Sequence, residues 1–129
     1  MLRDKKISGR VVYTDRLAPL SEEFGNNILE LLKKNSDLDG IFATSDVMAA
    51  NIIRACKKMG KRVPEDISIV GFDDTWISTL TYPSITTIHQ PVQEMCEYAI
   101  EAIVKKVKSE KVPSQVVFPV ELIDRESTK

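Results

Sequence analysis

The sequence has 129 residues, of which 43% are hydrophobic and 29% are charged. This length and balance are typical of one folded domain with its own core, and they exclude a disordered or membrane-embedded chain. Lysine and arginine total 18 against 19 acidic residues, so the chain has no net basic field with which to hold a phosphate backbone. No signal-peptide pattern and no apolar run of membrane-spanning length occurs. We therefore expect no membrane partner and little DNA binding by this chain alone.

The first part of the chain predicts strands that alternate with helices. Apolar residues at strand or helix spacing set the elements, with Ser21 as a helix cap and Gly60 as a helix terminator. The predicted elements are a strand at 10–14, a helix at 21–34, a strand at 41–43, a helix at 46–59 and a strand at 67–72. Two successive strand–helix–strand units with short connections predict an α/β fold with a parallel sheet flanked by helices.

The last part of the chain predicts a long amphipathic helix at 91–108 and a final strand at 115–119. The helix keeps an unbroken apolar stripe, with acidic residues early and basic residues late, as the helix dipole favours. Cys56 and Cys96 both fall on apolar stripes and lack metal or CxxC spacing, which predicts buried thiols. His89 is the only histidine and has no second ligand-type residue at metal spacing. We therefore expect no metal and no cofactor.

Hydroxyls and carboxylates follow three of the predicted strands, at 14–15, 44–46 and 73–75. In a parallel sheet, ligands bind beyond the carboxyl ends of the strands. Such side chains suit a hydroxyl-rich ligand such as a sugar. Purines and sugar phosphates stay open as alternatives, although no basic cluster points to a phosphate.

Four segments in a fixed order carry a family resemblance. They are VPEDISIVGFDDTWISTLTYPSITTIHQ at 63–90, IFATSDVMA at 41–49, Pro119, and REST at 125–128. Together they resemble the effector-binding core of bacterial transcription regulators of the lactose-repressor (LacI) family. The resemblance implies a periplasmic-binding-protein-like fold with two lobes, of which this chain holds an incomplete set.

The resemblance also implies how the chain is divided between lobes. Residues 1–88 correspond to the C-terminal lobe, 89–119 to a helix and strand of the N-terminal lobe, and 120–129 to a return segment and tail. We expect a fragment that lacks the helix-turn-helix head, so that DNA contact would come only through that missing head.

The same resemblance places candidate effector contacts. Asp73 matches a carboxylate that accepts hydrogen bonds from an effector, against the alternative that it only forms a turn. Ser45 stands where the family commonly has Asn, and the adjacent Asp46 is expected to cap a helix more than to touch ligand. Gln90 can contact the effector or the other lobe. Trp76 can stack on a sugar face or pack at a subunit surface.

The resemblance also implies a homodimer. The residues expected at its interface are Ile52, Ile53, Cys56, Ile77, Leu80 and Tyr82. The resulting prediction is a cytoplasmic, effector-sensing part of a transcription regulator that performs no chemical step, with a sugar as the small-molecule effector. Whether the effector induces or represses stays open.

Three alternatives compete with this interpretation. A periplasmic sugar-binding protein has the same fold, although GFDD, TTIHQP and REST look more like the regulators. A Mg²⁺-dependent α/β enzyme could use the acids at the strand ends, but no lysine or nucleophile motif accompanies them. A pure interaction module could use the surface at 76–82.

Overall fold

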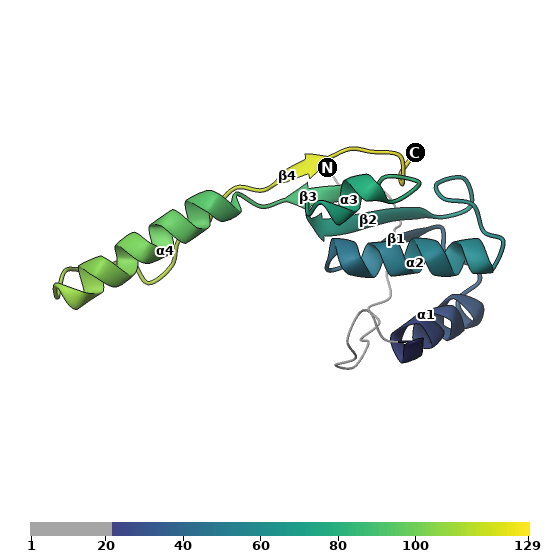
Figure 1. The fold of residues 1–129 in the computed structure, drawn as a ribbon, viewed down its shortest axis with the longest axis horizontal. Coiled ribbons are helices and arrows are strands. Elements are labelled where there is room, and N and C mark those ends of the chain that lie inside the picture. The colour runs from purple at the N-terminus through teal and green to yellow at the C-terminus, as the bar shows by residue number, and fades with distance from the viewer. Residues whose placement is uncertain (1–21) are drawn as a thin grey trace, which may run out of the picture.

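The computed structural model describes residues 22–129, with side chains from Gly25 onward. The predicted strand at 10–14, the Ser21 cap and the polar pair at 14–15 lie outside the described residues. The elements in chain order are α1 Glu22–Lys34, β1 Gly40–Phe42, α2 Asp46–Lys58, β2 Ser68–Asp73, α3 Ile77–Leu80, β3 Thr86–His89, α4 Val92–Val107 and β4 Glu121–Ile123 (Figure 1).

The strands form one sheet in the order β1-β2-β3-β4. β1, β2 and β3 are parallel, with Ile41 opposite Ile69 and Val70 opposite Thr86, whereas β4 runs antiparallel to β3. The predicted parallel sheet with helices is thus confirmed, with one antiparallel edge strand added. One detail of the prediction is wrong, because the final strand is 121–123 and not 115–119. β3 is an additional strand that the sequence pattern does not predict.

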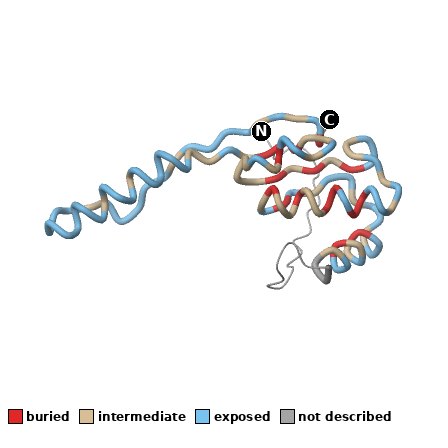
Figure 2. Tube along the Cα trace, in the orientation of Figure 1, coloured by how far each residue is buried: buried red, intermediate tan, exposed pale blue. Residues whose placement is uncertain are grey.

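The core lies between α2 and one face of the sheet, and α1 packs on α2. The sheet with α1, α2 and α3 forms what we call the body of the molecule, and Figure 2 shows the buried positions gathered there. The buried apolar residues are Ile28, Leu32, Ala43, Ala49, Ile52, Ile53, Ala55, Cys56, Ile67, Ile69 and Ile85. Gly60 ends α2 as predicted, because its φ of 71° suits glycine.

Residues 90–120 form an arm that projects from the body (Figure 1). The arm consists of α4 and the segment that returns along it, and Tyr98 of α4 meets Phe118 of the return edge-to-face at 5.8 Å between ring centroids. No residue of α4 is buried. Its apolar stripe stays exposed at Val92, Met95, Ile100, Ile103, Val104 and Val107. Cys56 is buried as predicted, but Cys96 is exposed, so that prediction is wrong: within residues 22–129 nothing covers its side of α4.

Candidate functional site

The candidate effector residues converge on the carboxyl end of β2. Asp73 and Asp74 both have left-handed backbone, with φ of 101° and 53°, which is uncommon for residues other than glycine. Asp73 lies opposite His89 of β3 in the sheet register. One residue further on, the Gln90 side-chain amide donates a 2.8 Å hydrogen bond to Asp73 Oδ1. Asp73 and Gln90, 17 positions apart in sequence, therefore meet at one end of the sheet.

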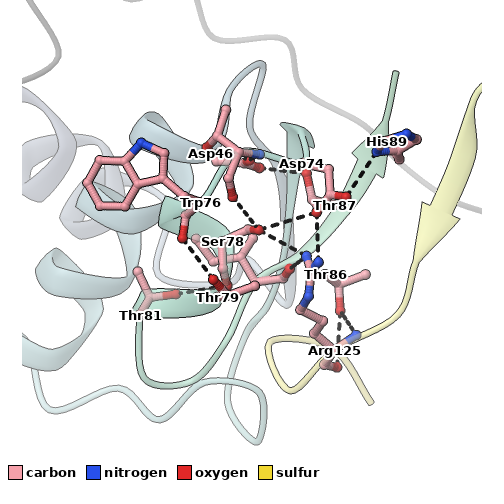
Figure 3. Close-up of polar contacts among 12 residues, drawn as sticks. Asp46, Asp74, Trp76, Ser78, Thr79, Thr81, Thr86, Thr87, His89 and Arg125 are labelled. Atoms are coloured by element: carbon pink, nitrogen blue, oxygen red, sulfur yellow. Dashed lines mark hydrogen bonds and ion pairs between the residues drawn. The ribbon is translucent and has the colours of Figure 1, made fainter. Parts of the chain in front are cut away.

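Asp74 joins three segments of the chain (Figure 3). Its Oδ1 accepts a 2.7 Å hydrogen bond from the Arg125 guanidinium, and its Oδ2 lies 3.0 Å from His89 Nδ1. The side chain is only 17% exposed. Burial alone would raise the pKa of Asp74, but the hydrogen bonds from Arg125 and His89 outweigh it, so the pKa is lowered. The carboxylate is thus held ionised as a fixed acceptor.

Arg125 anchors that carboxylate to the body. Its guanidinium also donates to Ser78 Oγ at 3.0 Å and to the Ile85 carbonyl at 2.9 Å. Its backbone N–H donates to Thr86 Oγ1 at 2.9 Å. In the sequence Arg125 stands out only as part of the REST motif, and nothing there predicts this role. A lone arginine in a polar tail carries no spacing signal for a partner 51 positions away.

Asp46 lies behind the site and not in it. Its side chain is fully buried and accepts from Thr75 N at 2.6 Å, Thr75 Oγ1 at 2.9 Å and Thr87 Oγ1 at 2.5 Å. The expected helix cap at Asp46 is wrong, because Ser45 caps α2 by accepting from Met48 N at 3.2 Å. Asp46 instead ties the start of α2 to the loop after β2 and to β3.

The remaining candidates lie apart from the Asp73–Gln90 pair. Trp76 is 71% exposed, and Figure 3 shows its indole on the far side of the network from His89. Leu80 and Tyr82 are also exposed, at 72% and 88%, and Ile77 is half-buried. By contrast, the expected interface residues of α2 are part of the monomer core: Ile52, Ile53 and Cys56. These three side chains offer no surface to a partner, because the sheet and α1 already cover them.

The site contains acceptors and amides but no metal-binding cluster: within residues 22–129, no group of three His, Cys, Asp or Glu side chains could hold an ion. A membrane-spanning helix is likewise absent from the described part of the chain. The half-buried Asp73 carboxylate uses one acceptor position on Gln90, and a carboxylate offers about four. The arrangement therefore suits recognition of hydroxyl or amine donors.

Comparison with known proteins defines the class to which this fold and site belong. Residues 9–128 match the family model of the periplasmic binding protein-like domain. The chain belongs to this family.

The relatives within the family are transcription regulators. The chain is 37% identical over 100 residues to the ribose operon repressor of Halalkalibacterium halodurans, covering 77% of this chain and 30% of the relative. It is 42% identical over 101 residues to the HTH-type transcriptional regulator MalR of Clostridium butyricum, covering 78% of this chain and 30% of the relative. The chain thus spans about a third of the length of these relatives.

Solved structures agree. The transcriptional regulator CelR–cellobiose complex superposes with a TM-score of 0.75 at 33% identity, covering 80% of this chain and 32% of that one. The lac repressor dimer bound to operator and the anti-inducer ONPF superposes with a TM-score of 0.76 at 28% identity, covering 84% and 38%. The resemblance to the effector-binding core of LacI-type regulators is confirmed.

Proposed function

We propose that this chain is the effector-sensing part of a LacI-type transcription regulator and that Asp73 and Gln90 contact the effector. The observation that carries the proposal is their meeting at the carboxyl end of β2 and β3, where ligands bind in open α/β sheets. Solved relatives hold cellobiose, D-xylulofuranose or lactose. A sugar is therefore the effector class we propose.

The division into lobes is part of the same proposal. Residues 1–88 form most of one lobe, 89–119 belong to a second lobe, and 120–129 return to the first. The exposed stripe of α4 supports this division, because such a stripe requires a partner surface. An effector that bridges two lobes favours their closed arrangement by its differential affinity, and this shift in population changes DNA binding.

The partners follow from the regulator role. DNA is bound by parts of the protein outside this chain, since the net charge of −1 offers no basic field. A homodimer uses the exposed surface formed by Trp76, Leu80 and Tyr82. The protein acts in the cytoplasm, where its operator is, and it performs no chemical step.

The test is an NMR titration of the isotope-labelled 129-residue chain with ribose, maltose, cellobiose and lactose. We expect one of these sugars to shift the backbone amides of 73–75 and the side-chain amide of Gln90. The affinity should be weak, with a Kd of about 1 mM or more, corresponding to only ~4 kcal/mol. The reason is that one wall of the crevice leaves most ligand groups in water.

Two variants make the titration specific. Asp73→Ala should abolish the shifts while the chain stays folded, because a hydrogen bond to a charged acceptor contributes about 1.5 to 3 kcal/mol. Asp39→Ala, which removes an exposed carboxylate directly before β1, at the opposite end of the parallel strands from the site, should leave them unchanged. The effector role of Asp73 is wrong if the Asp73→Ala chain binds as well as the wild type. The one-wall interpretation is wrong if the isolated chain binds any sugar at micromolar Kd.

A further inference from the structure

Arg125 links the tail of the chain to the loop that carries the candidate effector carboxylate. We propose that Arg125 is a positioning residue for the effector site: by fixing Asp74 it holds the Asp73–Asp74 turn in the conformation that aims Asp73 at Gln90. The inference rests on the proposed function for its ligand readout, but its geometric part is independent of any ligand.

The turn formed by Asp73 and Asp74 has an unusual backbone. Asp73 and Asp74 are consecutive non-glycine residues with positive φ, a combination that costs free energy and persists only where surrounding contacts hold it. The shortest of the side-chain contacts of these two residues is the ion pair between Asp74 Oδ1 and Arg125, at 2.7 Å. The two side chains are 17% and 18% exposed, so water competes weakly for this pair.

Arg125 is itself held rigidly in place. The Arg125 guanidinium is fixed by Ser78 and the Ile85 carbonyl as well as by Asp74, and its backbone N–H is fixed by Thr86 Oγ1. These contacts come from α3, from β3 and the residue before it, and from the turn after β2, all in the body and none in the arm. Arg125 therefore sets the position of Asp74 relative to the sheet.

Asp74 is connected through His89 to the effector pair, Asp73 and Gln90. Its other oxygen contacts His89 Nδ1 at 3.0 Å, and the next residue, Gln90, donates to Asp73. Arg125, Asp74 and His89 thus lead directly to the Asp73–Gln90 pair, and the neighbours of the turn come from the two segments that join the body to the arm: the end of β3 and the tail after β4. If Asp74 is released, the turn can relax toward a right-handed backbone, and the Asp73 carboxylate leaves Gln90.

The experiment compares Arg125→Gln, Arg125→Lys and Arg62→Gln in the isotope-labelled 129-residue chain. Arg62 is the matched control, because it also pairs with an aspartate at 2.7 Å, Asp66, but is 70% exposed and remote from the site. The ligand-free readout is the side-chain amide resonance of Gln90, recorded where each variant is folded by its backbone spectrum. The ligand readout is affinity for cellobiose, or for ribose, maltose or lactose if one of those binds the wild type.

We expect Arg125→Gln to move the Gln90 resonance to the position it has in Asp73→Ala and to weaken sugar binding about tenfold or more. Arg125→Lys should restore part of both, and Arg62→Gln should change neither. A purely structural clamp predicts lower stability with an unchanged Gln90 resonance in the folded variant, and that result overturns the proposal.

A second variant and the ligand-free readout cover two outcomes of this experiment. If Arg125→Gln does not fold, Asp74→Asn tests the same pair from the other side while keeping the remaining contacts of Arg125, and an unmoved Gln90 resonance there overturns the proposal equally. If no sugar binds the wild type, the proposed function fails, whereas the Gln90 resonance still decides whether Arg125 positions the turn.

Discussion

Replacing Asp46 with alanine should strongly destabilise the body, because this fully buried side chain connects three elements. The variant loses three hydrogen bonds and leaves the partly buried Thr75 backbone N–H without its acceptor. The two threonine hydroxyls can rotate toward other acceptors, but the N–H cannot. Hydrogen bonds to a charged group contribute about 1.5 to 3 kcal/mol each, and removal of the buried charge offsets part of the loss of three, so we expect a net loss of about 3 kcal/mol.

Urea unfolding followed by far-UV circular dichroism measures this loss. At an m-value of about 1.5 kcal/mol per molar for a domain of this size, the midpoint should fall by roughly 2 M. Asp46→Asn keeps the shape and one acceptor oxygen, so it should lose about 1 kcal/mol. Asp39→Ala is the exposed control and should not move the midpoint. If Asp46→Ala unfolds at the same urea concentration as Asp39→Ala, the three contacts do not stabilise the fold and the reasoning is refuted.

Four further outcomes follow from the structure. Gly71→Ala should cost about 1 to 3 kcal/mol in urea unfolding, because its new methyl group would lie 2.5 Å from Asp46 Oδ1; an unchanged midpoint would show that the site has room. Ser127→Ala should cost about 1 to 3 kcal/mol and speed amide exchange at position 86, since the Ser127 hydroxyl accepts from that buried N–H at 2.8 Å; undiminished protection there would contradict this. The lowered pKa of Asp74 means that its stabilising contribution is complete above the ordinary pKa of ~3.9 and disappears as pH falls through the lower folded value, so the cost of Asp74→Asn should be full at neutral pH and should shrink as pH falls below ~3.9; a cost that does not change with pH would refute the linkage. The isolated chain should self-associate through the stripe of α4 as well as through the Trp76, Leu80 and Tyr82 surface, and Ile103→Glu should weaken this association, as judged by light scattering; an association that Ile103→Glu leaves unchanged would refute that pairing.

The sequence predicted those elements whose pattern is local. The boundaries of α2, β2 and α4 lie within about two residues of the expected ones, because each has a cap, a terminator or an unbroken apolar period. β3 was missed as a strand because Thr86–His89 has no apolar alternation, and it becomes a strand by pairing with β2. The apolar run at 115–119 was taken for a strand, but it lies on the arm, and only the following residues reach β3.

The candidate site divides in the same way. The sequence names both Asp73 and Gln90 as candidates, because the family motif at 63–90 contains both residues and the resemblance gives each a place near the effector. The parts contributed by Arg125 and Ser127 were not within reach of the sequence, since they depend on the tail returning across the sheet after the arm. Ser127 shows this clearly: its hydroxyl donates to the Ile69 carbonyl, 58 positions away. No periodicity in the sequence encodes such a contact.

The arm also bears on how the monomer melts. α4 has 16 residues and buries none of them, and an isolated helix of that length is marginal in water. The body, by contrast, has a packed core and should unfold cooperatively. The monomer therefore consists of two cooperative units of different size. The cooperative unfolding transition should correspond to the body alone, which has fewer residues than the whole chain. The amides of α4 would already be exchanging with solvent, because this single helix frays.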